Sequence, residues 1–235
     1  MMKINNNLPL VSVLMSAFNS ETTLERAIDS IINQSYENIE FIICNDASTD
    51  NTKRILEKYS NLYNQIEIIN NENNIGLTKS LNLLINKSKG DFIARQDADD
   101  YSDTERIKEQ IKHCINNNFE AVFTRSYNLN KNTAMQFISY LIPYRILIKF
   151  RNPFVHGTML IKSKIIKSLG GYDEDFYFAQ DYKLYRDLID NNVKIKKERK
   201  ILYYLNTKDN ISSLRKKEQK YYANCVKNRK IPKTF

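Results

Sequence analysis

The chain has 235 residues and a mass of 27.7 kDa, enough for one large domain or two small ones with a buried core. Its 42% hydrophobic and 27% charged residues are ordinary for a globular protein and exclude a wholly disordered chain. No apolar stretch reaches the ~20 residues that span a bilayer, because polar residues interrupt the longest one, 137–150. The N-terminus also lacks the apolar core of a secretory signal.

The net charge of +9 is unevenly distributed along the chain. Residues 1–100 carry 9 basic and 14 acidic side chains, whereas residues 101–235 carry 27 and 13. The last 42 residues alone, 194–235, carry 14 basic and 3 acidic side chains. This asymmetry predicts an electrostatic partner for the C-terminal end only, rather than a nucleic-acid-binding surface over the whole protein.

The three cysteines, Cys44, Cys114 and Cys225, are widely spaced and form no CxxC pair. The two histidines, His113 and His156, are also far apart in the sequence. We therefore expect neither a disulfide framework nor a zinc site, and a reducing, cytoplasmic setting fits this composition best.

In the first half of the chain, buried-strand patterns alternate with amphipathic-helix patterns. Continuous apolar runs indicate strands, and apolar residues at helical spacing indicate helices. In chain order we predict a strand at 10–16, a helix at 21–34, a strand at 40–44, a helix at 51–59, a strand at 66–69, a helix at 77–86, a strand at 92–94 and a helix at 104–117.

This order predicts an α/β fold with a mostly parallel central sheet flanked by helices. Right-handed crossovers bring the carboxyl ends of parallel strands to one edge, which is where ligands bind in open α/β sheets. The candidates for function are therefore the segments that follow the strands, at 16–21, 45–50, 70–76 and 96–100.

The second half is less regular, and we expect it to complete a single domain over residues 1–205. The predicted elements are a strand at 121–127, an aromatic-rich helix or hinge at 136–150, a strand at 158–161, helices at 163–169 and 180–191, a strand at 200–205 and a basic helix ending near 227 with Ser212 or Ser213 as its cap. Within this domain, residues 1–100 contain the candidate ligand-binding segments and residues 101–205 form the less regular part. A basic tail, 206–235, would follow.

Three carboxylates, Asp97, Asp99 and Asp100, follow the strand at 92–94. Because like charges repel, such a cluster beside a buried strand calls for a cation or strong hydrogen bonds. Carboxylate oxygens suit hard cations such as Mg²⁺ or Mn²⁺, which commonly carry a diphosphate. The structural alternative is an acidic cluster at a helix N-terminus. The chain has no GxxxxGK[ST] and no GxGxxG, so a nucleotide would be held by side chains and the metal.

The sequence resembles the family-2 glycosyltransferases, which have the GT-A fold and usually use nucleotide-sugar donors. The resemblance covers residues 9–205 and implies a nucleotide-sugar-binding half at 1–100 and an acceptor-side half at 101–205. The matching motifs, in order, are VSVLMSAFN at 11–19, the SY turn at 35–36, FIICNDASTD at 41–50, NIGLTKSLN at 74–82, GDFIARQDADD at 90–100, GGYDE at 170–174 and QDYKL at 180–184.

The resemblance implies roles for individual residues. Ser16, Phe18 and Asp46 would hold the base of the nucleotide, with Phe18 stacking on it and Asp46 accepting a uracil N3–H, which favours a UDP donor. Asp99 would bind Mn²⁺ or Mg²⁺ on the diphosphate, with Asp97 near the ribose or the metal. The remaining implied donor contacts are Asn19, Gly76, Lys79 and His156, although His156 is equally open to a purely structural role.

Asp181 occupies the position of the catalytic base in the family motif, and one carboxylate suffices for a single inverting displacement. Desolvation would raise its pKa towards the working pH, whereas the N-terminus of the helix at 180–191 would lower it, and the sequence leaves both effects open. Two departures stand out. Gln180 replaces the usual Glu, and no His follows the last strand, where Lys208 is an alternative contact for the diphosphate.

The predicted function is the transfer of a hexosyl or N-acetylhexosaminyl group to a glycan or lipid-linked acceptor in bacterial surface-glycan synthesis, such as lipopolysaccharide or capsule. The basic tail is either a solvated helix face or a contact with an anionic membrane. The alternatives are a nucleotidyltransferase, which also uses an acidic metal site, and a basic nucleic-acid-binding module, against which the acidic first half argues.

Overall fold

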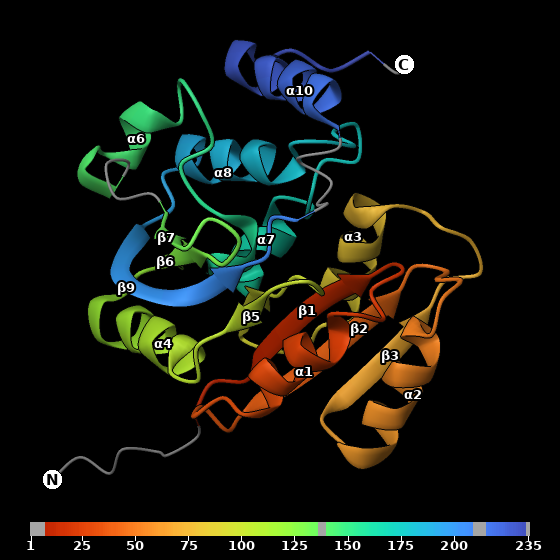
Figure 1. Cartoon of the computed structure of the whole chain (residues 1–235). Helices are drawn as coiled ribbons and strands as arrows, with labels where there is room; N and C mark the ends of the chain where they lie inside the picture. The colour runs from red at the N-terminus through yellow and green to blue at the C-terminus, as the bar shows by residue number, and fades with distance from the viewer. Residues whose placement is uncertain (1–7, 136–139, 209–214, 234–235) are drawn as a thin grey trace, which may run out of the picture.

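The computed structural model describes residues 8–135, 140–208 and 215–233. The described residues form a central sheet with helices on both faces (Figure 1). Within these residues no helix is long and apolar enough to cross a membrane.

The first half forms the predicted parallel part of the sheet, in the order β3-β2-β1-β4. The α/β fold with a central sheet flanked by helices is therefore confirmed. The elements, alternating as predicted, are β1 (Val11–Ala17), α1 (Leu24–Ile32), β2 (Ile39–Asn45), α2 (Thr52–Leu62), β3 (Ile66–Asn70), α3 (Leu77–Lys87) and β4 (Phe92–Arg95).

Consecutive residues of the apolar strands enter two different cores, because side chains alternate across a sheet. On β1, Val11, Val13 and Met15 pack with α1, α2 and α4 (Arg106–Asn117) on one face of the sheet. Leu14 of the same strand faces a second core on the other side, formed with α3, α7 (Ser163–Ser168), α8 (Gln180–Asp190) and α10 (Lys216–Asn228). Burial on both faces explains why these strands read as continuous apolar runs.

The second half extends the same sheet with mixed pairings, consistent with its less regular pattern. β8 (Met159–Lys162) is antiparallel to β4 and to β6 (Ala121–Asn128), and β9 (Ile195–Leu205) is parallel to β6. Two strands of two residues each, β5 (Tyr101–Ser102) and β7 (Thr133–Ala134), pair with β9 and β6. The remaining elements are α6 (Tyr144–Leu147) and the 3₁₀ turn η1 (His156–Thr158).

Besides the strand β5, which was not predicted, the structure differs from the sequence prediction at three further places. β9 begins at Ile195 rather than at 200, because its first half pairs with β6. Between the strand predicted at 121–127 and the segment at 136–150, the structure has the short strand β7, which forms a hairpin with β6. Among its described residues, the aromatic segment at 136–150 is helical only at 140–141 and in the short helix α6. Residues 136–139 and the suggested caps Ser212 and Ser213 lie outside the described residues.

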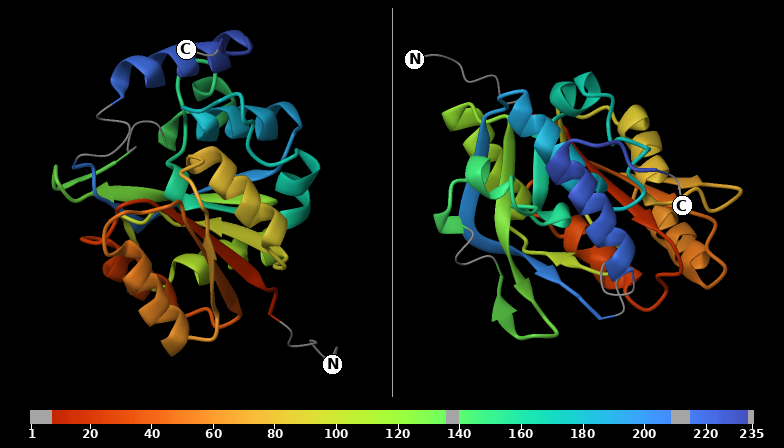
Figure 2. Two further views of the ribbon diagram at one scale, coloured as in Figure 1. Left: turned by 90° about the vertical axis from the view of Figure 1, so that its right-hand side faces the viewer. Right: turned by 90° about the horizontal axis from the view of Figure 1, so that it is seen from above.

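Helix α10, which carries much of the C-terminal positive charge, packs outside α8 (Figure 2). Its residues Tyr222, Cys225 and Val226 are buried and join the core that α8 forms with the sheet. Lys216, Lys217 and Lys220 on the same helix are exposed. The helix therefore combines a structural inner face with a basic outer face.

Candidate active site

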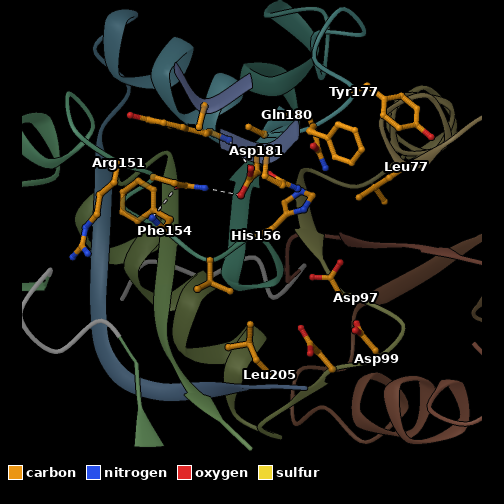
Figure 3. A pocket seen from close by; sticks show the side chains of 18 of the residues that line it. Leu77, Asp97, Asp99, Arg151, Phe154, His156, Tyr177, Gln180, Asp181 and Leu205 are labelled. Atoms are coloured by element: carbon orange, nitrogen blue, oxygen red, sulfur yellow. Dashed lines mark hydrogen bonds between the residues drawn. The ribbon is translucent and has the colours of Figure 1, made fainter. Parts of the chain in front are cut away.

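A cavity of about 500 Å³ lies where the carboxyl end of β4 faces the N-terminus of α8. Figure 3 shows Asp97 and Asp99 on one side of it and Asp181 and His156 on the other. Four of the residues predicted from the sequence thus lie around one space. The walls come from the acidic loop 97–100, the segments 151–156, 177–182 and 205–206, and α10, through Gln219, Ala223 and Lys227.

The acidic loop is held in place by a buried arginine and a buried tyrosine. Arg95 is 2% exposed, and its Nη2 donates a 2.6 Å hydrogen bond to Oδ1 of Asp97 within an ion pair. The backbone N–H of Asp97 donates to the hydroxyl of Tyr203 on β9 at 3.1 Å, and that hydroxyl lies 3.4 Å from Oδ2 of Asp97. The charge of the Asp97 carboxylate is therefore balanced by Arg95, and its position is fixed by Arg95 and Tyr203.

Asp99 and Asp100 share the loop without a basic side chain bonded to their carboxylates among the described residues. Burial and the neighbouring Asp97 carboxylate raise the pKa of Asp99 to about 6. The same causes, together with Asp99, raise the pKa of Asp100 well above its ordinary value, although Oδ1 of Asp100 accepts a 2.7 Å hydrogen bond from the N–H of Asn206. A cation would relieve the repulsion among these carboxylates.

Asp181 lies in the first turn of α8 and lines the cavity. Burial raises its pKa to about 6, although hydrogen bonds from the N–H of Tyr182 and from Asn152 act in the opposite direction. Desolvation therefore outweighs the hydrogen bonds that favour the anion, a balance that could not be decided from the sequence. The residue before the helix, Ala179, has a φ of 56°, in the left-handed region, at the turn into α8.

Asn152 orients the carboxylate of Asp181. Its Nδ2 donates a 2.6 Å hydrogen bond to Oδ2 of Asp181, while its own Oδ1 accepts a hydrogen bond from the N–H of Phe154. The second bond identifies which end of the amide points towards Asp181. Asp181 is thus held between its own helix and the 151–156 segment.

His156 lies in the 3₁₀ turn η1 and also lines the cavity. Its Nε2 is 2.7 Å from the hydroxyl of Tyr172, and its ring meets the Tyr172 ring edge-on. Burial and the Arg95 cation lower the pKa of His156 to about 3. The imidazole is therefore neutral at physiological pH, and it can offer a hydrogen bond but no positive charge.

The predicted base-binding residues lie at the neighbouring strand ends and not among the residues that line this cavity. Ser16 is the last residue but one of β1 and pairs with Cys44 of β2, and Phe18 is 48% exposed just beyond the strand. Asp46 is buried, and its carboxylate accepts hydrogen bonds from Asn71 and from the N–H groups of Ile75 and Gly76. Asp46 therefore shapes the loop that precedes α3.

The other implied donor contacts occupy the rim of this region. Oδ1 of Asn19 accepts a 2.8 Å hydrogen bond from the N–H of Thr49, which ties the β1 end to the β2 end. Gly76 has a φ of 85° and leaves room for the Tyr177 ring, which a Cβ would approach to 3.0 Å. Lys79 is exposed on α3. The structure thus brings Asp46 and Gly76 together and leaves Lys79 apart from the cavity.

The donor atoms around the acidic loop are compatible with a divalent cation shared with a ligand. Among the residues that the structure describes, no group of three or more His, Cys, Asp or Glu side chains could hold a metal ion alone. Asp99 and Asp97 offer carboxylate oxygens, the type of donor that Mg²⁺ and Mn²⁺ prefer. Because Asp97 is also paired with Arg95, ligand oxygens and water would fill the other coordination positions of the cation.

The sequence analysis missed several residues that position this site: Arg95, Asn152, Tyr172 and Tyr203. Arg95 could have been found from its spacing, because residues i and i+2 point to the same side of an extended strand. The other three act across 16 to 106 positions of sequence. No local pattern marks such contacts.

Comparison with known proteins gives a consistent result. The sequence model of Glycosyl transferase family 2 matches residues 12–193. The putative glycosyltransferase EpsE of Bacillus subtilis is 36% identical over 170 residues, which cover 71% of this chain and 61% of that protein. The O-antigen biosynthesis glycosyltransferase WbnJ of Escherichia coli is 30% identical over 220 residues, 92% of this chain and 85% of that protein. The chain therefore spans about three fifths of EpsE and most of WbnJ.

Two solved structures share the fold. S. aureus TarS 1–349, in complex with UDP-GlcNAc, has a TM-score of 0.74 at 23% identity, over 86% of this chain and 59% of that chain. The mannosyltransferase PcManGT from Pyrobaculum calidifontis, in complex with GDP-Man and Mn²⁺, has a TM-score of 0.77 at 17% identity, over 97% of this chain and 67% of that chain. At these identities the likeness concerns the fold.

Proposed function

This chain belongs to glycosyl transferase family 2, and from that premise we propose that it is an inverting, metal-dependent glycosyltransferase. It would move a hexosyl or N-acetylhexosaminyl group from a nucleotide sugar to an acceptor hydroxyl. One observation carries the proposal. A carboxylate with a pKa of about 6, Asp181, faces the acidic pair Asp97 and Asp99 across a single cavity.

Asp181 is suited to act as the general base. A group with a pKa of about 6 is largely ionised at neutral pH and retains enough basicity to take the proton of an acceptor hydroxyl. Asn152 and the N–H of Tyr182 hold its two oxygens, so the acceptor would approach a fixed carboxylate. A single displacement with one base inverts the configuration at the anomeric carbon.

On the opposite side of the cavity, Asp99 and Asp97 would hold Mn²⁺ or Mg²⁺ against the diphosphate of the donor. The cation would supply charge stabilisation for the departing nucleoside diphosphate. The ion pair with Arg95 balances the charge of Asp97 and fixes the acidic loop. Asp99 is therefore the carboxylate that would bind the cation most directly. The complex of PcManGT with Mn²⁺ supports this assignment by likeness of fold.

For the donor we propose a UDP sugar, bound at the ends of β1 and β2. Phe18 is exposed at this edge and would stack on the base, next to Ser16. Asp46 already accepts hydrogen bonds from Asn71 and from the N–H groups of Ile75 and Gly76, and it would accept the uracil N3–H with the remaining lone pair of Oδ2. Asn19, Lys79 and His156 would add contacts to the sugar or diphosphate. The TarS complex with UDP-GlcNAc supports this choice.

For the acceptor we propose a glycan or a lipid-linked saccharide of bacterial surface-polysaccharide synthesis, in line with the O-antigen role in the name of WbnJ. The protein would work in the cytoplasm, with α10 and the rest of segment 206–235 offering exposed basic residues to the inner face of the membrane. Lys227 and Gln219 of α10 line the same cavity as Asp181, which would place the acceptor between α8 and α10.

Thermal-shift measurements with UDP, GDP and a panel of nucleotide sugars, each with and without Mn²⁺, test the donor and the metal together. We expect UDP or a UDP sugar to raise the melting temperature only when Mn²⁺ is present. No response to any nucleotide with the cation would contradict the proposed donor site.

Analysis of the released products separates the alternatives. The proposed reaction yields a nucleoside diphosphate, whereas a nucleotidyltransferase would yield pyrophosphate. A nucleic-acid-binding module would instead bind DNA or RNA with an affinity that falls steeply with salt concentration.

A further inference from the structure

Three large apolar side chains are exposed in the segment 141–150, which contains α6 and is called the α6 segment below. Leu141, Ile146 and Phe150 are 68%, 52% and 66% exposed, whereas Leu147 and Ile148 between them are buried in the core. The segment thus has both covered and uncovered apolar side chains, and those of Leu141, Ile146 and Phe150 are the uncovered ones. We call Leu141, Ile146 and Phe150 the α6 face.

The α6 face lies among basic residues. Arg145 and Lys149 are exposed within the same segment, and Arg151 follows at once. Residues 140–151 contain three Lys and Arg residues and no Asp or Glu. The acidic partners that usually intersperse a protein surface are therefore absent from this stretch of sequence. Exposed apolar side chains with basic neighbours complement an anionic lipid interface.

The α6 face is close to the entrance of the cavity. Arg151 and Asn152, which follow Phe150 directly, line the cavity that contains Asp181. α10, with its exposed lysines, lies on the same side of the molecule, and both helices lie away from α2 (Figure 1 and Figure 2). A surface that received the α6 face would therefore lie beside the acceptor end of the cavity.

We propose that the α6 face inserts into the headgroup region of an anionic bilayer. Apolar side chains gain free energy on leaving water, and Arg145 and Lys149 would remain among the anionic headgroups. A contact of this kind needs no membrane-spanning segment. The insertion depends only on the surface of the protein. Insertion would present a lipid-linked acceptor to Asp181, and this consequence rests on the proposed function.

Co-sedimentation with vesicles tests the proposal without donor or acceptor, so its outcome does not depend on catalysis. The probes are vesicles of phosphatidylcholine alone and of phosphatidylcholine with phosphatidylglycerol. We expect binding to the anionic vesicles, weakened by salt and by Lys149→Glu. Ile146→Ser and Phe150→Ser should each lower the partition coefficient on the order of tenfold.

Leu62→Ser is the matched control, because Leu62 is 64% exposed at the end of α2, away from the α6 face. It should bind vesicles like the unmodified protein. Melting temperatures of all variants show whether they remain folded, which is expected since the replaced side chains are mostly exposed.

Three results would overturn the proposal. The first is equal vesicle binding by the unmodified protein and the Ile146→Ser, Phe150→Ser double variant. The second is loss of binding only when Lys216, Lys217 and Lys220 are replaced by Glu, which would assign the membrane contact to α10. The third is a dimer, measured by sedimentation velocity, that the double variant dissociates, because a second copy of the chain would then cover the α6 face.

Discussion

Nδ2 of Asn152 donates a 2.6 Å hydrogen bond to Oδ2 of Asp181. The bond joins the segment after α6 to the first turn of α8, and it acts on a carboxylate whose pKa burial has raised to about 6. Because the anionic form accepts this bond, Asn152 moderates the effect of burial. One residue from a distant segment thus fixes the position of the Asp181 carboxylate and also lowers its pKa against the effect of burial.

Replacement of Asp181 by Asn should remove transfer and leave donor binding intact. The amide keeps the shape of the side chain but cannot take the acceptor proton. We expect the turnover rate to fall by about 10²–10⁴-fold, the usual contribution of a general base. Turnover is measured by release of the nucleoside diphosphate, and UDP affinity in the presence of Mn²⁺ is the control. Turnover close to that of the unmodified protein would show that the base is another group.

The turnover rate of the unmodified protein should rise with pH through about 6, because Asp181 must lose its proton to act as a base. In Asn152→Ala the hydrogen bond to the anionic form is lost, so the pKa of Asp181 should rise further. A bond to a charged group contributes ~1.5 kcal/mol, which corresponds to a displacement of about one pH unit. The pH profile of turnover measures this displacement.

Asn61→Ala provides the comparison for this experiment, since Asn61 is exposed on α2. Its pH profile should coincide with that of the unmodified protein. If Asn152→Ala lowers the rate equally at every pH, Asn152 has only a structural role.

Asp99→Asn should stabilise the fold and abolish metal-dependent UDP binding. The folded state raises the pKa of Asp99 from 3.8 to about 6, so its contribution to stability is present at low pH and lost as the pH rises through about 6. At pH 7 the ionised carboxylate therefore destabilises the fold, and Asn removes that cost. A gain of roughly 1 kcal/mol corresponds to about 2–4 °C in melting temperature.

The melting temperatures of both proteins should be compared at pH 7 and at pH 4.5, without metal or nucleotide. The advantage of Asp99→Asn should shrink at the lower pH, where Asp99 is protonated. A lower melting temperature at pH 7, or UDP affinity that still depends on Mn²⁺, would contradict the assigned role of Asp99.

Gly157→Ala should destabilise the protein and disturb the acidic loop together. A Cβ at position 157 would overlap the phenol of Tyr203, whose hydroxyl accepts the hydrogen bond from the N–H of Asp97. Overpacking of this kind costs about 1–3 kcal/mol. Denaturant unfolding measures the loss, and UDP binding with Mn²⁺ measures the effect on the site.

Tyr203→Phe separates these two effects, because it keeps the ring and removes the hydroxyl. It should weaken UDP binding with little change in the unfolding midpoint. Unfolding of Gly157→Ala at the same midpoint as the unmodified protein would mean that the Tyr203 ring can move aside.

Much of the fold could be predicted from local patterns. The apolar runs of β1, β2 and β4 and the helical spacing of α1 and α3 are properties of contiguous residues, and their alternation determines a parallel arrangement. The two-residue strand β5 could not be predicted, because it exists only through its pairing with β9, about a hundred residues away. The same applies to the first half of β9, which pairs with β6.

The site shows a similar division. The sequence predicted that Asp97, Asp99 and Asp181 are functional and left His156 open between a donor contact and a structural role. The structure places all four around one cavity. Their ionisation could not be predicted, because it depends on burial and on bonds between distant segments, such as the bond of His156 with Tyr172. The roles of these residues in catalysis stay predictions.

The position of β9 also has a consequence for the order of folding events. Tyr204 of β9 pairs with Tyr101, and Asn206 just beyond the strand donates to Asp100, so the acidic loop is closed by residues about a hundred positions later in the chain. Contacts of such long sequence separation form slowly, since the chain must lose much entropy to make them. During refolding, helix signals should therefore recover before the ability to bind a nucleotide does.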